Sequence, residues 1–156
     1  MTLSSWRIVK TKYLSRAFSG EGAALTGGRW NSPGTEVVYT ASSASLALLE
    51  ILVNLGSNAP LTGYMLIEVA FDEDLVDEIA DRELPRDWRT SPPSPSVQQL
   101  GDRWARGMVS AVLAVPSVIV PHERNYILNP RHADFHRIRI GDPTSFPIDE
   151  RLARVK

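Results

Sequence analysis

Cysteine is absent from the 156-residue sequence. Its absence excludes disulfide frameworks, thiol nucleophiles and cysteine-rich zinc sites. Long apolar runs are absent as well: the chain has no uninterrupted apolar stretch of about eighteen residues, and its N-terminal MTLSSWRIVK lacks the apolar core of a signal peptide. We therefore expect a soluble protein of the cytoplasm that does not associate with membranes.

An excess of basic residues is also lacking, because 17 Lys and Arg stand against 18 Asp and Glu, for a formal net charge of -1. Nucleic-acid-binding modules usually carry excess positive charge to neutralise phosphates, so direct nucleic acid binding is not expected. The chain does have apolar content, at 43% hydrophobic residues, and a length that suits one compact domain. We predict a single domain over residues 1–156.

Short strands and two longer helices are predicted from local patterns. The run that begins at Ser42 has a serine cap, good helix formers and a stop at Gly56, and Ser96–Leu113 places apolar residues at steps of three or four. Strands are predicted at Trp6–Val9, Glu36–Thr40, Gly63–Phe71, Ser117–Val120, Asn125–Leu128 and Phe135–Ile140. The proline-rich Thr90–Ser96 is predicted to be a surface loop. This irregular mixture favours an α+β fold.

Two common kinds of site find no support. Gly20-Glu21-Gly22 is not followed by a third glycine at the dinucleotide-fold spacing, so a Rossmann site is not expected. The histidines His122, His132 and His136 match no zinc signature, so we expect no metal.

Polar side chains embedded among apolar or small residues are the informative feature. Glu50 lies within Ala47–Val53 (ALLEILV), so its carboxylate must reach a polar seam, pair with a cation or line a cleft, unless it is an ordinary surface glutamate. Ser117 is a single hydroxyl bracketed by prolines, either bonded locally or pointing into a site.

Arg29 and Tyr39 have two interpretations each. Two glycines precede Arg29 and allow close backbone approach, and its guanidinium suits a diphosphate, although a salt bridge to Glu50 would explain it too. Tyr39 could stack on a nicotinamide or adenine ring, or simply belong to the core.

The ordered set WRIV, GGRWN, VVYTA, ALLEILV, VPSVIVP and NYILNP resembles the RES domain family, named for an arginine, a glutamate and a serine. Those residues would be Arg29, Glu50 and Ser117, and the resemblance runs from about Trp6 to the FHRIRIG segment. It implies a toxin paired with an antitoxin that carries an Xre-like helix-turn-helix, and an ADP-ribosyltransferase-like fold with a split mixed or antiparallel sheet, flanking helices and an NAD cleft.

The resemblance further implies a reaction at the nicotinamide–ribose bond of NAD. A fixed carboxylate can stabilise the oxocarbenium-like transition state, a role that Glu50 would take. Arg29 would hold phosphate or ribose oxygens, Tyr39 would pack against a ring, and Ser117 would hydrogen-bond substrate or orient Glu50. Arg7 and Asn125 are further candidates for lining the cleft.

The acceptor and the class of activity stay open. Water or phosphate as acceptor would deplete NAD, and a cellular protein as acceptor would make the chain a mono-ADP-ribosyltransferase. Leu48 stands where many protein-modifying transferases carry a second Glu or Gln, which favours depletion. A metal-independent ribonuclease using a late histidine with Arg124 or Arg131, and a non-catalytic binding module, are the other hypotheses. A homodimer within the toxin–antitoxin complex is also open.

Overall fold

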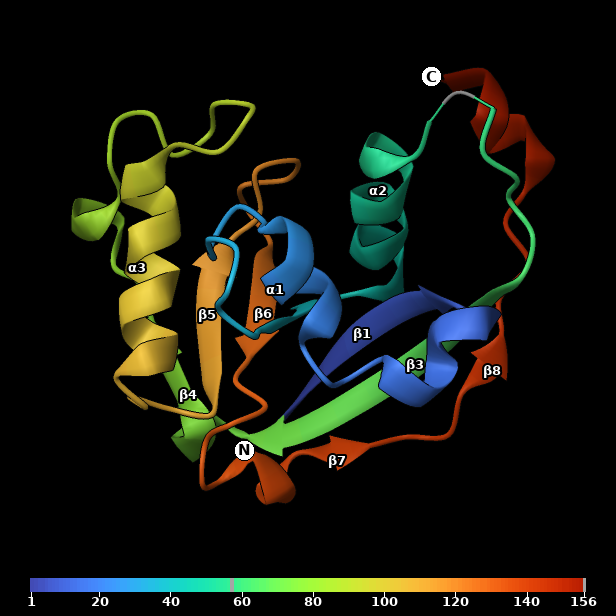
Figure 1. Cartoon of the computed structure of the whole chain (residues 1–156). Helices are drawn as coiled ribbons and strands as arrows, with labels where there is room; N and C mark the ends of the chain where they lie inside the picture. The colour runs from blue at the N-terminus through green and yellow to red at the C-terminus, as the bar shows by residue number, and fades with distance from the viewer. Residues whose placement is uncertain (57, 156) are drawn as a thin grey trace.

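In the described part of the chain, residues 1–56 and 58–155, this computed structural model combines one sheet with short helices (Figure 1). The strands are β1 (Thr2–Lys10), β2 (Val38–Ala41), β3 (Tyr64–Asp72), β4 (Val76–Glu78), β5 (Val112–Pro116), β6 (Arg124–Leu128), β7 (Arg139–Ile140) and β8 (Thr144–Ser145). The α-helices are α1 (Glu21–Thr26), α2 (Ala44–Asn54) and α3 (Pro95–Arg106), and 3-10 turns lie at Thr11–Arg16, Glu73–Leu75, Asp81–Glu83, Phe135–Arg137 and Glu150–Val155. None of the described helices is long and apolar enough to cross a membrane.

The sheet divides between β1 and β2. Its strand order is β4-β5-β6-β2-β1-β3-β7, with β8 also paired to β3. β4 and β5 run parallel and the other pairs are antiparallel. β1 pairs with β3 along all 9 of its residues but with β2 only at Trp6 and Ala41. The α+β fold with a split, mixed sheet that the resemblance implies is therefore confirmed.

Each half of the sheet is covered by its own helix (Figure 1). α3 packs beside β5 through a core made of Trp30, Val37, Ile79, Val97, Trp104, Ala105, Leu113, Val115 and Ile127. α2 stands over β1 through a second core made of Ile8, Ala41, Leu46, Ala47, Tyr64 and Ile148. In Figure 1, the segment from α1 to β2 lies between the two helices.

Several elements follow the sequence closely. The predicted first helix is α2, where the side chain of Ser43 accepts a hydrogen bond from the amide of Leu46 at 3.0 Å and so caps the helix. The strands predicted at Trp6–Val9, Gly63–Phe71 and Asn125–Leu128 fall within or against β1, β3 and β6. The prediction at Glu36–Thr40 overlaps β2, which begins two residues later.

The second helix is shorter than predicted. α3 ends at Arg106 rather than at Leu113, because Gly107 caps it and Met108 takes a left-handed φ of 51°. The apolar residues that seemed to continue the helical pattern are in fact the start of β5, whose 5 residues are all buried. A buried strand and a buried helical turn have the same apolar composition, so the pattern alone does not separate them.

Of the predicted late strands, one is wrong and another is correct only at its end. Ser117–Val120 is a loop, because the hydroxyl of Ser117 accepts the amides of Ile119 and Val120 and removes both donors from any strand ladder. The prediction at Phe135–Ile140 is reduced to the two residues of β7, preceded by a 3-10 turn.

Candidate active site

A cleft of about 1080 Å³ lies over the split in the sheet. Five charged side chains line it. Four are cations, Arg7, Lys10, Arg16 and Arg29, and one is the carboxylate of Glu50. Among the described residues of the cleft wall, Glu50 is the sole acidic side chain. The charged residues that line the cleft are therefore four cations and one carboxylate, a balance that favours an anionic ligand.

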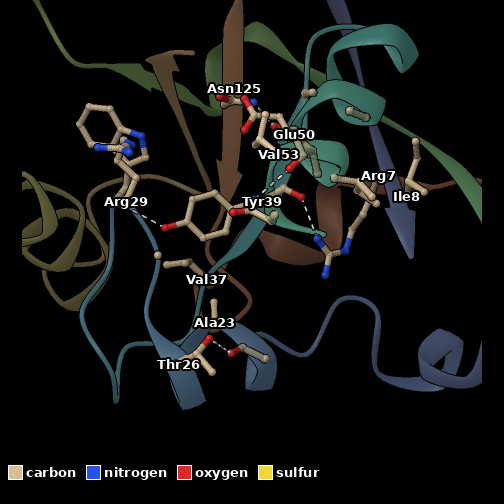
Figure 2. A pocket seen from close by; sticks show the side chains of 18 of the residues that line it. Arg7, Ile8, Ala23, Thr26, Arg29, Val37, Tyr39, Glu50, Val53 and Asn125 are labelled. Atoms are coloured by element: carbon tan, nitrogen blue, oxygen red, sulfur yellow. Dashed lines mark hydrogen bonds between the residues drawn. The ribbon is translucent and has the colours of Figure 1, made fainter. Parts of the chain in front are cut away.

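α2 presents Glu50 to the cleft. The helix buries Leu46, Ala47 and Leu52 against the rest of the molecule, and Glu50 lies on the half-buried side. Figure 2 shows the carboxylate of Glu50 beside Asn125, which comes from β6 across the split. The cap at Ser43 fixes the start of α2, so the height of Glu50 above the sheet is set by a rigid element.

Ser117 holds the carboxylate of Glu50 from outside the cleft. Its hydroxyl donates to Oε1 of Glu50 at 3.0 Å and accepts the amides of Ile119 and Val120, each at 3.1 Å. Ser117 is fully buried and does not line the cleft. Of the two roles expected for this serine, the geometry offers the orientation of Glu50 and not direct contact with a ligand.

Burial raises the pKa of Glu50 above the ordinary value for glutamate. Hydrogen bonds from Ser117 and Asn125 and the charge of Arg29 act in the opposite direction. The carboxylate is thus poorly solvated but provided with donors that favour its charged form. A nearby positive charge would therefore stabilise the ionised carboxylate of Glu50 strongly.

Arg29 does not form a salt bridge with Glu50 in the described structure. Its Nη1 donates to the carbonyl oxygens of Trp88 at 3.0 Å and Thr90 at 2.7 Å, and its Nη2 donates to Oγ of Ser91 at 3.3 Å. The guanidinium therefore anchors the proline-rich loop, whose residues Ser91–Pro93 form part of the cleft wall. Figure 2 shows Arg29 and Glu50 on opposite sides of Tyr39 in that view.

Arg7 is a half-buried cation that lines the cleft. Its Nε donates to the carbonyl of Ala17 at 2.7 Å and its Nη1 to the carbonyl of Tyr39 at 2.8 Å. Burial lowers the pKa of Arg7 to about 10, and no carboxylate of the described residues forms an ion pair with it. A partly buried positive charge without a countercharge is poorly solvated, so Arg7 is suited to contact an anion in the cleft.

Tyr39 combines a place in the cleft wall with a structural hydroxyl. The hydroxyl donates to Oδ1 of Asn31 at 2.7 Å and accepts the amide of Trp30 at 3.0 Å. Burial raises the pKa of Tyr39 above its ordinary value, so the phenol stays protonated at neutral pH. The ring lines the cleft and is placed to contact a ligand.

Tyr39→Phe is expected to lower the free energy of unfolding by about 1–3 kcal/mol, because the buried side chain of Asn31 and the amide of Trp30 would each lose a partner. Chemical denaturation monitored by tryptophan fluorescence measures the change. Tyr126→Phe is the control, since the ring of Tyr126 packs edge-on against Phe71 outside the cleft. Equal stability of the two variants would contradict the structural role of the Tyr39 hydroxyl.

The residues that hold the segment around Arg29 in place were not predicted from the sequence. Asn31, Gln98 and Asp102 all hydrogen-bond to the glycine-rich segment around it. Asn31 stands within the GGRWN motif and could have been found there, but Asp102 lies on a predicted amphipathic helix, where a carboxylate is usually solvated.

The histidines lie outside the cleft. Nε2 of His132 lies 3.2 Å from the carbonyl of Met108, and Nδ1 of His136 lies 2.8 Å from the carbonyl of Ala133. Within residues 1–56 and 58–155, no group of three or more His, Cys, Asp or Glu side chains is placed to hold a metal ion.

Comparison with known proteins finds relatives in sequence and in structure. The model of the RES domain matches residues 4–149. A protein named Toxin Res from Photorhabdus laumondii is 41% identical over 152 residues, 97% of each chain, and a Prs ADP-ribosylating toxin from Sphingobium sp. is 42% identical over 160 residues, 99% of each chain. The fold is shared with a chain of the M. tuberculosis MbcT–MbcA toxin–antitoxin complex, at a TM-score of 0.73 and 17% identity, over 99% of this chain and 88% of that chain. With its match to the domain model and these relatives along nearly its whole length, the chain belongs to the RES domain family.

Proposed function

We propose that this protein is the toxin of a toxin–antitoxin pair and that it cleaves the nicotinamide–ribose bond of NAD. The observation that carries the proposal is the carboxylate of Glu50, held by Ser117 in a cleft whose other charged residues, among those the structure describes, are all cations. NAD matches this charge pattern, because its diphosphate is anionic and its reacting ribose becomes positive in the transition state. The names of the relatives support the same direction.

The chain's residues would act mainly by positioning and electrostatics. As the bond between ribose C1′ and the pyridine nitrogen breaks, its electron pair neutralises the nicotinamide ring, so no strong general acid is required. The positive charge left on the ribose faces the carboxylate of Glu50. Arg7 and Arg29 would hold the diphosphate, the ring of Tyr39 would contact the ligand, and Asn125 would steady Glu50.

Water or phosphate is the acceptor that the site favours. Its oxygen would bond to C1′ on the face opposite the leaving ring, and a proton from water or phosphate would be released. Leu48, two residues before Glu50, packs into the core under α2, so this position supplies no second polar group to the cleft. NAD would therefore be depleted by hydrolysis or phosphorolysis.

Mono-ADP-ribosylation of a cellular protein is the second candidate. It is favoured by the 42% identity to the Sphingobium protein, whose name states an ADP-ribosylating activity directed at Prs. Both candidates share the bond that breaks and differ only in the group that attacks C1′.

The residues suggested for a ribonuclease lie outside the cleft. Arg124 forms an ion pair with Glu78, and Arg131 forms one with Glu36, both outside the cleft. The three histidines lie outside it as well, so among the described residues of the cleft wall there is no histidine to pair with an arginine.

An antitoxin is the proposed partner, of the kind that carries an Xre-like helix-turn-helix. The related fold in the MbcT–MbcA complex supports a toxin–antitoxin assembly. Leu49 and Val53 are exposed on α2 beside the cleft and offer apolar surface to a bound chain. An antitoxin segment that covers the cleft would stop turnover on mixing.

The experiment that tests the proposed function uses purified protein free of antitoxin. It is incubated with NAD alone, with added phosphate and with cell extract, while nicotinamide release and label transfer to protein are followed. Release without extract supports NAD depletion. Release only with extract, with label on a protein band, supports the transferase, and no release in any arm overturns the NAD reaction.

Ser117→Ala is expected to move the acidic limb of the pH profile of kcat/KM to higher pH. The raised pKa of Glu50 already places that limb above the ordinary range for glutamate, and the hydrogen bond from Ser117 holds it down. Without this bond the ionised carboxylate is lost at a higher pH. The free energy of unfolding should also fall by about 1–3 kcal/mol, since two amides lose their acceptor. An unchanged acidic limb would contradict the role of Ser117.

A further inference from the structure

The segment that carries Arg29 into the cleft, residues 27–35, belongs to no named helix or strand. It is held from behind by α3, which contributes none of the described residues of the cleft wall. Nε2 of Gln98 donates to the carbonyl of Gly28 at 2.9 Å, and Asp102 accepts the amide of Ser32 at 2.9 Å and its hydroxyl at 2.5 Å. These contacts lie on both sides of Arg29.

Asp102 is the unusual member of this set. It is 6% exposed, yet it accepts its hydrogen bonds from the neutral amide and hydroxyl of Ser32, and none of the ion pairs of the described residues includes it. A buried carboxylate without a cation costs free energy that a polar or apolar residue would not. Helix packing alone therefore gives no reason for an aspartate at this position.

The backbone of α3 also touches the segment directly. A Cβ atom placed on Gly101 would lie 1.6 Å from the carbonyl oxygen of Trp30, so the two backbones are in contact at the residue next to Arg29. The loop that leads into α3 completes the arrangement, since it supplies the acceptors for the guanidinium of Arg29. Backbone and side chain of Arg29 are thus both fixed by one stretch of the chain.

We propose that Asp102 is a positioning residue for Arg29: by holding Ser32 it fixes the segment that sets the guanidinium in the cleft, and it influences the reaction only through Arg29. This inference rests on the proposed function. A displacement of about 1 Å of a positioning group can cost a large part of the rate, so a buried contact outside the cleft can matter to the chemistry.

A double-mutant cycle tests whether Asp102 influences the reaction only through Arg29. Asp102→Ala is expected to lower kcat/KM for NAD about tenfold in the otherwise unaltered chain but less than about twofold in the Arg29→Ala background, because residues that act as one unit are not additive. Asp102→Asn keeps an acceptor for the amide of Ser32 and should recover most of the activity. Arg103→Ala, an exposed position on the same helix, should leave it unchanged.

Amide hydrogen exchange gives a readout that does not depend on activity. Asp102→Ala should speed exchange of the amides of Trp30 and Ser32 while β5 stays protected, and Ser32→Ala provides the milder variant if Asp102→Ala does not fold. Equal fold-losses in both backgrounds, or unchanged exchange, would overturn the proposal. If the unaltered protein released no nicotinamide, the proposed function alone would fail, and the exchange rates would still decide whether Asp102 holds the segment.

Discussion

Glu50→Gln is expected to lower nicotinamide release from NAD by about 10²–10³-fold while the fold is retained. The amide has the shape of the carboxylate and can still accept the hydrogen bond that Ser117 donates, but it carries no charge to place beside the positive ribose. The expected loss lies in kcat more than in KM, since the charge develops only in the transition state. Steady-state release of nicotinamide with the purified variant measures it.

The thermal stability of the Glu50→Gln variant should not fall with its activity. Burial raises the pKa of Glu50, so its charged form is disfavoured in the folded protein and folding is less favourable at a pH above that pKa than below it. The neutral glutamine removes this cost, and thermal unfolding at neutral pH should show an equal or higher Tm. Full activity in Glu50→Gln would exclude the proposed role of the carboxylate, and loss of fold would point to a structural one.

Gly101→Ala is expected to destabilise the protein by about 3 kcal/mol or more, which corresponds to a fall of roughly 10 °C in Tm for a chain of this length. The added methyl group would lie 1.6 Å from a backbone carbonyl oxygen, where no side-chain rotation relieves the clash. Either α3 or the Arg29 segment must move. Differential scanning calorimetry measures the change in stability.

Gly22→Ala is the matched control for that substitution. Gly22 also lies in a helix, but a Cβ atom there would meet nothing within 4 Å. Alanine should therefore stabilise α1 by about 0.5–1 kcal/mol through its better helix propensity. If Gly101→Ala behaved like Gly22→Ala, the close approach of α3 to Trp30 would be contradicted.

Local patterns in the sequence predicted the elements with a strong signal of their own. α2 has a serine cap and a continuous run of helix formers, and the polar Glu50 within it is visible without any structure. The boundary between α3 and β5 was not predicted, because apolar residues at helical spacing, Met108 and Val112, continue past the helix-ending Gly107. The left-handed Met108 that ends the helix carries no sequence signature, since left-handed residues are usually glycine or asparagine.

The partners of the site residues were less predictable than the residues themselves. Glu50 and Ser117 are 67 positions apart, and only the family resemblance brought them together before the structure did. Arg29 binds backbone carbonyl oxygens, which any residue supplies, so no pattern could reveal its anchoring role. The buried Asp102 resembles an ordinary surface aspartate until the fold places Ser32 above it.

The single pair that joins β1 to β2 leaves a gap in the backbone ladder, and the side chain of Arg7 spans it by donating to the carbonyl of Tyr39. Arg7 therefore links the two halves of the sheet and also forms part of the cleft wall. A substitution of Arg7 that alters the cleft is therefore expected also to weaken the contact between β1 and β2. At Arg7, the same guanidinium that lines the cleft also joins the strands beneath it, so the shape of the cleft and the stability of the sheet depend on one side chain.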